Sequence, residues 1–213
     1  MRENNESIIQ GYNGKFSSIL LFGPPASGKG TLGQFLSSAK TQYHLSSGEL
    51  FRNLPAYSPA GRLYYTYASQ GKLMPDQETI DIWKCYVQGL VATNSYYPES
   101  QDLLLDGIPR TRGQAEMLDK WIQVRHIIVL EASDTEELLR RMQERDRREG
   151  KMNIDSEVLT TRLEVYRSEI DKLLDFYPKH LISRVNADQK PLEVLRDVLV
   201  RLSHLLSRPT PPI

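Results

Sequence analysis

Apolar positions along the chain form short continuous runs that alternate with longer segments in which apolar residues recur every three or four positions. A short apolar run bounded by polar or turn residues indicates a buried strand, whereas the wider spacing indicates an amphipathic helix. The runs predict strands at residues 18–22, 44–46, 103–105, 126–130 and 181–185. The periodic segments predict helices at residues 31–39, 60–70, 77–91, 112–121, 136–148, 156–176 and 192–206.

Strands that alternate with helices are typical of a parallel sheet with helices on both faces. We therefore expect an α/β fold, a three-layer sandwich around a five-stranded parallel sheet. The length of 213 residues suits one domain, which we place at residues 16–206. Residues 1–15 and the proline-rich tail at 207–213 are expected to be flexible. Ligands of such a sheet bind beyond the carboxyl ends of its strands.

Composition narrows the function classes. Lys plus Arg and Asp plus Glu both number 27, so the net charge is zero and a basic nucleic-acid-binding surface is not expected. Cys85 is the only cysteine, which excludes an internal disulfide and a cysteine-rich zinc site. No stretch has the length of a signal-peptide core or a membrane span. We expect a soluble cytoplasmic protein without nucleic-acid or membrane partners.

The segment GPPASGKGT, residues 23–31, follows the first expected strand and precedes the first expected helix. It fits the phosphate-binding loop, with one residue added between the lysine and the threonine. Glycines let backbone N–H groups turn toward one centre, the helix N-terminus adds a positive end, and Lys29 adds a point charge. A plain glycine-rich turn gives no reason for this lysine or for Thr31. The segment therefore predicts a site for nucleotide phosphates.

With Gly30 between Lys29 and Thr31, the chain resembles the adenylate kinases within the nucleoside monophosphate kinase family. Further segments carry the resemblance: HLSSGELFR from residue 44, GKLMPD from 71, LLLDGIPRTRGQA from 103 and RMQERDRREGKMNIDSEVLTTRLEVY from 141. The third departs from the family in Ile108, where phenylalanine is usual. The resemblance implies a helical acceptor-nucleotide subdomain at about residues 47–76 and a short lid at about residues 145–156. Both are expected to close over the substrates.

The resemblance implies direct in-line transfer of the γ-phosphoryl group of ATP to AMP by a monomer, with Mg²⁺ as the cofactor and no zinc. The residues that it assigns to ATP are Pro25, Ala26, Ser27, Gly28, Lys29, Gly30, Thr31, Arg141, Arg145 and Lys190. Those that it assigns to AMP are Ser47, Gly48, Arg52, Leu73, Met74, Gly107, Arg110, Gln114 and Arg162. The implied catalytic residues are Lys29, Arg110, Arg145 and Arg162. The resemblance also implies that Asp106 and Thr31 bind Mg²⁺ through water molecules.

Side-chain chemistry agrees with several of these roles. Asp106 ends an apolar strand, and a carboxylate there suits the water shell of Mg²⁺ near phosphates. Arg110 offers a rigid fork to a phosphate, and Gln114 carries both a donor and an acceptor, which matches the mixed edge of adenine. Gln114 therefore favours AMP over UMP or CMP. Ser47 agrees, because the pyrimidine-preferring relatives tend to have alanine there.

Departures from the family pattern lie mainly in the lid. Lys151 replaces a family arginine, and Asn153 and Ile154 replace two aspartates, although Asp155 lies one residue away. Lysine lacks the bidentate geometry of arginine, so lid closure or the chemical step is expected to be slower. In the phosphate loop Ala26 replaces a glycine, which costs about 1 kcal/mol if the position needs positive φ.

Three alternatives stay open at this point. The first is a kinase for UMP, CMP or another monophosphate, and the second is a weakly active nucleotide-binding relative that serves as a regulatory module. The third is a phosphate-loop kinase for a metabolite that is not a nucleotide. The arginines at 141, 145 and 148 also fit a solvated helix face, and Arg148 is a candidate replacement for the lost lid fork.

Overall fold

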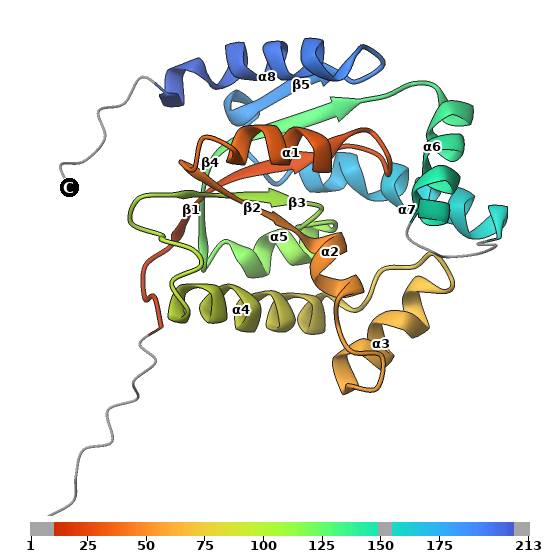
Figure 1. The fold of residues 1–213 in the computed structure, drawn as a ribbon, viewed down its shortest axis with the longest axis horizontal. Helices are drawn as coiled ribbons and strands as arrows, with labels where there is room; N and C mark the ends of the chain where they lie inside the picture. Colours follow the sequence, from red (N-terminus) through yellow and green to blue (C-terminus); the bar gives the residue numbers. More distant parts are fainter. Residues whose placement is uncertain (1–10, 149–154, 207–213) are drawn as a thin grey trace, which may run out of the picture.

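A five-stranded sheet forms the centre of the computed structural model, which describes residues 11–148 and 155–206. Its order is β2-β3-β1-β4-β5, and every neighbouring pair is parallel (Figure 1). The strands are β1 (Phe16–Phe22), β2 (Gln42–Ser46), β3 (Asp102–Asp106), β4 (Ile122–Glu131) and β5 (Ile182–Asn186). The five expected strands and their parallel arrangement are confirmed.

The described residues also form eight α-helices and a short 3-10 turn, Lys179–Leu181. The helices are α1 (Lys29–Ser37), α2 (Ser47–Arg52), α3 (Pro59–Ala68), α4 (Asp76–Ala92), α5 (Arg112–Leu118), α6 (Thr135–Arg148), α7 (Ser156–Leu174) and α8 (Pro191–Leu206). The seven expected helices are present. The helix expected at 112–121 is shorter, because β4 begins at Ile122 and the carbonyl of Trp121 accepts the N–H of Phe16 at 2.8 Å.

Two apolar cores lie on opposite faces of the sheet, and β1 contributes to both. Phe16 and Leu20 belong to the larger core, which includes Trp83 of α4 and residues of α5 and the end of α7. Ile19 and Leu21 point into the smaller core, with residues of α1 and α8. Figure 1 shows α8 at the top of the view and α4 and α5 toward the bottom, with the strands between them. Because both faces are covered, the three central strands β1, β3 and β4 each contain a continuous apolar run.

The carboxyl ends of the strands meet at one edge of the sheet, at the right in Figure 1. The short α2, which was not among the predicted helices, begins directly after β2. The side chain of Ser46 caps it by accepting the N–H of Glu49 at 3.5 Å. The arm that carries α2 and α3 lies on one side of this edge, with α6 and the start of α7 beside it. The edge is therefore where a site enclosed from several sides can form.

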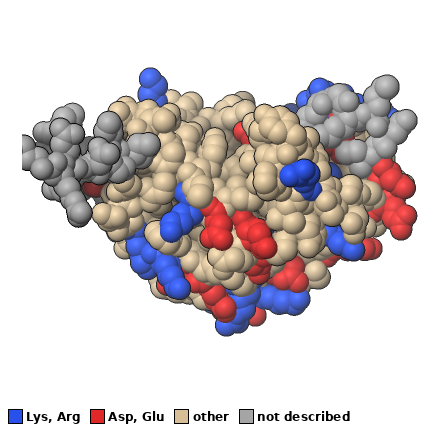
Figure 2. Space-filling view, turned by 90° about the horizontal axis from the view of Figure 1, so that it is seen from below, with Lys and Arg blue, Asp and Glu red and all other residues tan. Residues whose placement is uncertain are grey.

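The surface carries charges of both signs. On the face seen in Figure 2, which is the side of the sheet that carries α4, Lys and Arg side chains lie among Asp and Glu side chains. This mixture agrees with the zero net charge of the whole sequence. Within residues 11–148 and 155–206, no helix is long and apolar enough to cross a membrane.

We expect Gly61→Ala to destabilise the protein, because a Cβ at Gly61 in α3 would lie 2.0 Å from the carbonyl oxygen of Pro55. Relieving that overlap requires a backbone shift, at a cost of about 1–3 kcal/mol. Gly89 in α4 is the matched control, since a Cβ there meets nothing within 4 Å. Gly89→Ala should stabilise by up to about 1 kcal/mol. Urea unfolding of both variants measures the difference, and effects of the same sign would contradict the expectation.

Candidate active site

Residues 23–31 connect β1 to α1 at the carboxyl edge of the sheet. A Cβ at Gly23 would lie 2.9 Å from the carbonyl oxygen of Leu130 in β4, so the loop can pass this strand only with a glycine. Gly28 and Ala26 have positive φ values of 96° and 65°. Ala26 therefore has the positive φ at which the sequence analysis expects alanine to be strained relative to glycine. The tight loop brings the N-terminus of α1, with its unpaired N–H groups, to the edge of the sheet.

Lys29, the first residue of α1, points back into this loop. Its Nζ donates hydrogen bonds to the carbonyl oxygens of Gly23 and Pro24, both at 2.8 Å. Burial lowers the pKa of Lys29 to about 8; the neighbouring Asp106 opposes this effect, and Arg110 and Arg145 add to it. The amine is therefore held in place with a lowered pKa, and an incoming anion would favour its charged form.

Asp106, the last residue of β3, is buried and faces the start of α1, where a Cβ on Gly30 would lie 3.9 Å from its Oδ2. His44 in β2 places its Nε2 3.6 Å from the same oxygen. Burial by itself raises the pKa of the Asp106 carboxyl, but His44, Lys29 and Arg110 together hold it below its usual value. Asp106 is thus an ionised carboxylate, and His44 lies beside it.

The turn after β3 fixes Arg110. The carbonyl oxygen of Gly107 accepts hydrogen bonds from the Oγ of Ser47 and the Nε of Arg110, both at 2.7 Å. Arg110 also donates to the Ser47 hydroxyl at 3.3 Å. A Cβ at Gly107, which has φ 75°, would lie 2.9 Å from the Ser47 oxygen. Burial lowers the pKa of Arg110, and Asp106 opposes that shift.

Gln114 in α5 supports the same turn from behind. Its side chain is 1% exposed, and its Oε1 accepts the backbone N–H of Arg110 at 2.7 Å. One acceptor position of the amide is therefore already used inside the protein. The side chain thus holds the turn in place from a buried position. This qualifies the sequence argument, which treated the donor and the acceptor as equally available.

A cavity of about 590 Å³ opens at this edge of the sheet. Most of the predicted residues line it, from the phosphate loop, the turn after β3 and four helices. The predicted residues in its wall are Pro25, Ala26, Ser27, Gly28, Lys29, Gly30, Thr31, Gly48, Arg52, Leu73, Asp106, Gly107, Arg110, Arg141, Arg145 and Arg162. Residues far apart in the sequence thus meet in one place.

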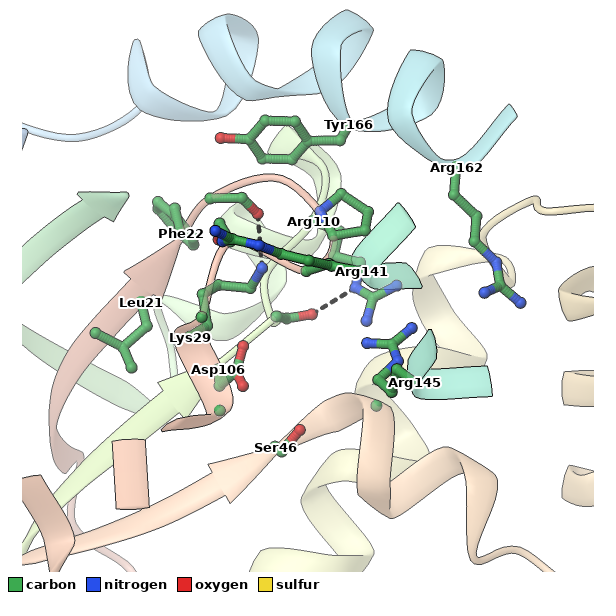
Figure 3. A pocket seen from close by; sticks show the side chains of 18 of the residues that line it. Leu21, Phe22, Lys29, Ser46, Asp106, Arg110, Arg141, Arg145, Arg162 and Tyr166 are labelled. Atoms are coloured by element: carbon green, nitrogen blue, oxygen red, sulfur yellow. Dashed lines mark hydrogen bonds between the residues drawn. The ribbon is translucent and has the colours of Figure 1, made fainter. Parts of the chain in front are cut away.

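Acidic and basic side chains both line this cavity, and the basic ones are more numerous. Figure 3 shows Lys29, Asp106, Arg110 and Arg145 around one space, with Arg162 reaching toward it from α7. The Nε of Arg141, also in α6, donates to Glu137 at 2.7 Å. In α2, Gly48 makes room for Arg52, because a Cβ there would lie 2.9 Å from its Nη1.

Four predicted residues do not form part of the cavity wall. Ser47, Met74 and Gln114 are buried directly behind it. Lys190 is exposed, and its neighbours Gln189 and Pro191 line the cavity instead. Ser47 and Gln114 act on the wall through Arg110, whereas the side chain of Lys190 lies outside the wall. The lid departures Lys151, Asn153 and Ile154 lie outside the described residues.

Several cavity residues were not predicted, because none of them occupies a motif position to which a role was assigned. Tyr64 lines the wall from α3, and its ring stacks on Phe51 with centroids 5.9 Å apart and an angle of 19°. Ala68, four positions later, lines the wall too. In α7, Tyr166 and Ile170 continue the four-residue spacing that begins at Arg162. Extending each motif along its helix face by this spacing would have found them.

The lid end of the site contains two residues that the sequence singled out as possible replacements. Arg148 does line the cavity, and its Nε donates to the carbonyl of Glu144 at 3.4 Å. Asp155 instead caps α7, since its Oδ1 accepts the N–H of Glu157 at 3.0 Å. This carboxylate is exposed and committed to the helix end.

We expect Ala26→Gly to stabilise the free protein, because glycine adopts φ 65° without the Cβ strain that alanine has there. The gain should be up to about 1 kcal/mol, reduced by the greater flexibility of glycine in the unfolded chain. Lys40 has φ 60° and lies outside the cavity, so Lys40→Gly is the matched control. Thermal unfolding of both variants tests this, and a loss of stability in Ala26→Gly would show that the strain estimate is wrong.

Comparison with known proteins agrees with this geometry. The family model described as adenylate kinase matches residues 21–182. The chain is 32% identical over 196 residues to an adenylate kinase of Flavobacterium psychrophilum, which covers 87% of this chain and 99% of the relative. It is 34% identical to an adenylate kinase of Thermobifida fusca, in a match that covers 79% of this chain and 89% of the relative. It is 33% identical to an adenylate kinase of a Synechococcus species, in a match that covers 86% of this chain and 94% of the relative. The chain therefore belongs to the adenylate kinase family and is a nucleoside monophosphate kinase.

Proposed function

We propose that this enzyme catalyses the reversible reaction of ATP with AMP to give two ADP, as a cytoplasmic monomer. The observation that carries the proposal is the distribution of cations around one cavity. The phosphate loop and α6 supply Lys29, Arg141 and Arg145 on one side, and α2 and the turn after β3 supply Arg52 and Arg110 on the other. Two such groups suit two phosphate chains that meet between them.

The donor nucleotide belongs on the side of the phosphate loop. The N–H groups of the loop and of the first turn of α1 bind the phosphates there, and Lys29 exchanges its two carbonyl partners for phosphate oxygens. Arg141 and Arg145 approach from α6. Gln189 and Pro191, which line the cavity after β5, pack against the base.

The acceptor belongs beside the turn after β3. Arg110 is held there by Gly107 and Ser47, so its guanidinium is oriented before a phosphate arrives. Arg52 adds a second fork from α2. Gln114 lies buried behind this wall and holds the backbone of Arg110, so it supports the acceptor site from behind. AMP is proposed as the acceptor because the chain belongs to the adenylate kinase family.

The residues near the phosphate loop fit a magnesium ion bound with ATP. Mg²⁺ near phosphates takes one or two carboxylates and keeps several waters. Asp106 is an ionised carboxylate facing the start of α1, and Thr31 lines the same wall. Elsewhere in residues 11–148 and 155–206, no group of three or more His, Cys, Asp or Glu is placed to hold a metal. When bound, Mg²⁺ neutralises charge on the transferred phosphoryl group.

The protein promotes transfer by positioning and by charge. The attacking atom is a phosphate oxygen of AMP that is already anionic at neutral pH, so no general base is required. Arg52 and Arg110 place that oxygen in line with the γ-phosphorus, and Lys29, Arg145 and Arg162 stabilise the charge of a loose transition state. Closure of the acceptor arm at 47–76 and of the lid at 145–156 excludes water, the competing nucleophile.

The test is ADP production from Mg·ATP with AMP, dAMP, CMP, UMP and GMP in parallel. We expect AMP to be the preferred acceptor and Lys29→Ala to lower kcat by about 10²-fold or more, since it removes a cation beside the transferred group. Exposed Lys120→Ala should stay within about twofold of the parent enzyme. Preference for UMP or CMP would show instead that the enzyme is a pyrimidine nucleoside monophosphate kinase. Nucleotide binding without transfer to any acceptor would favour a regulatory module.

The affinity for Mg·ATP should fall as the pH rises above about 8. Lys29 has a pKa of about 8 in the free protein, and bound phosphates raise it, so binding above that pH requires uptake of a proton. The dissociation constant should be about tenfold higher at pH 9 than at pH 7. Lys29→Met, measured by calorimetry in the same buffers, should bind weakly with no such slope. An equal affinity of the parent protein at the two pH values would contradict this.

A further inference from the structure

Asp146 in α6 is a buried carboxylate close to the cavity's arginines. Within residues 11–148 and 155–206, it and Asp106 are the only buried acids. Asp146 follows Leu138 and Met142 at four-residue intervals, and those two side chains pack against α7. The same helix face would therefore be expected to carry a third apolar residue at this position. A carboxylate there needs a physical reason, because burying a charge is costly unless a cation lies close by.

Arg162 of α7 is a cation that lies close to Asp146. Its Nη1 lies 3.6 Å from Oδ2 of Asp146, and the two side chains are 23% and 3% exposed. Burial lowers the pKa of Arg162, Asp146 opposes this shift, and Arg145 adds to it. Asp146 is thus enclosed between α6 and α7. Arg162 has its Nη1 beside Asp146 and also lines the cavity.

The arginine needs such a partner because other cations surround it. Arg162 shares the cavity with two lysines and five more arginines, and Arg52 and Arg145 act on it directly. Without an acid behind it, repulsion would turn the guanidinium away from the cavity toward solvent. An ion pair across the contact between α6 and α7 limits that motion.

We propose that Asp146 is a positioning residue that holds Arg162 toward the cavity before the phosphates arrive. The inference rests on the proposed phosphoryl transfer, in which Arg162 stabilises transferred charge. Asp146 does not touch the substrates and acts only through Arg162. Orienting the arginine in advance lowers the ordering cost of binding and transfer.

The test is a double-mutant cycle of Asp146→Asn and Arg162→Ala, with kcat and KM measured for Mg·ATP and AMP. Asp146→Asn keeps the shape and removes the charge, and we expect it to lower kcat by about tenfold. In the Arg162→Ala background the same change should alter kcat by less than about twofold. Glu164→Gln is the control, since Glu164 is exposed on the same helix as Arg162 and carries the same charge.

An effect of Asp146→Asn that is equally large with and without Arg162 would overturn the proposal, because a general loss of packing is independent of that arginine. So would an unchanged kcat in the folded variant. If Asp146→Asn fails to fold, Asp146→Glu replaces it in the cycle. The charge is then kept but displaced, and its effect on kcat must still disappear without Arg162.

Wild-type turnover separates this inference from the proposed function. If the wild type does not phosphorylate AMP, the proposed function fails, and the same cycle is measured by calorimetry as the affinity for inorganic tripolyphosphate. Asp146→Asn should then change the dissociation constant at least about threefold in the wild type and less than about twofold beside Arg162→Ala. Equal changes in both backgrounds, or none, overturn the positioning role.

Discussion

Mutual repulsion between cations is the constraint on which the site depends. Nucleotide phosphates need several positive charges close together, but the protein must also fold when no phosphate is bound. Eight cationic residues line the cavity: Lys29, Arg52, Lys72, Arg110, Arg141, Arg145, Arg148 and Arg162. Burial and repulsion lower the pKa of three of them, Lys29, Arg110 and Arg162. The surrounding structure therefore has to supply acceptors that stand in for the ligand.

Those acceptors come from the parts of the fold that are most rigid. The carbonyls of Gly23 and Pro24 hold Lys29, and the carbonyl of Gly107 holds Arg110. These carbonyls belong to turns at the ends of central strands, where the paired β1, β3 and β4 fix the backbone. Left-handed or close-packed glycines make the turns possible. The glycines of the motifs thus serve both the ligand and the unliganded protein.

The sequence predicted the fold and most of the cavity because the residues concerned obey local rules. Apolar runs and helical spacing gave the five strands and seven of the helices, and the phosphate loop, Asp106 and Arg110 lie in contiguous motifs. Tyr64 and Asp146 were not found because their importance depends on which helices pack together. The sequence also could not predict that the Oε1 of Gln114 accepts a hydrogen bond from the Arg110 N–H, since only the folded turn brings these two atoms together.

The acids at the lid end show how a local requirement can override a role inferred from position. Asp155 is near the aspartates that the family pattern places in the lid, yet it precedes α7, where the first N–H groups of the helix lack partners. A carboxylate at that point is most useful as a cap, and an exposed cap cannot also balance a half-buried arginine. The balancing acid lies nine residues earlier, at position 146, where α6 and α7 exclude water. An ion pair there is less screened than one in an exposed lid, so charge balance favours the buried position.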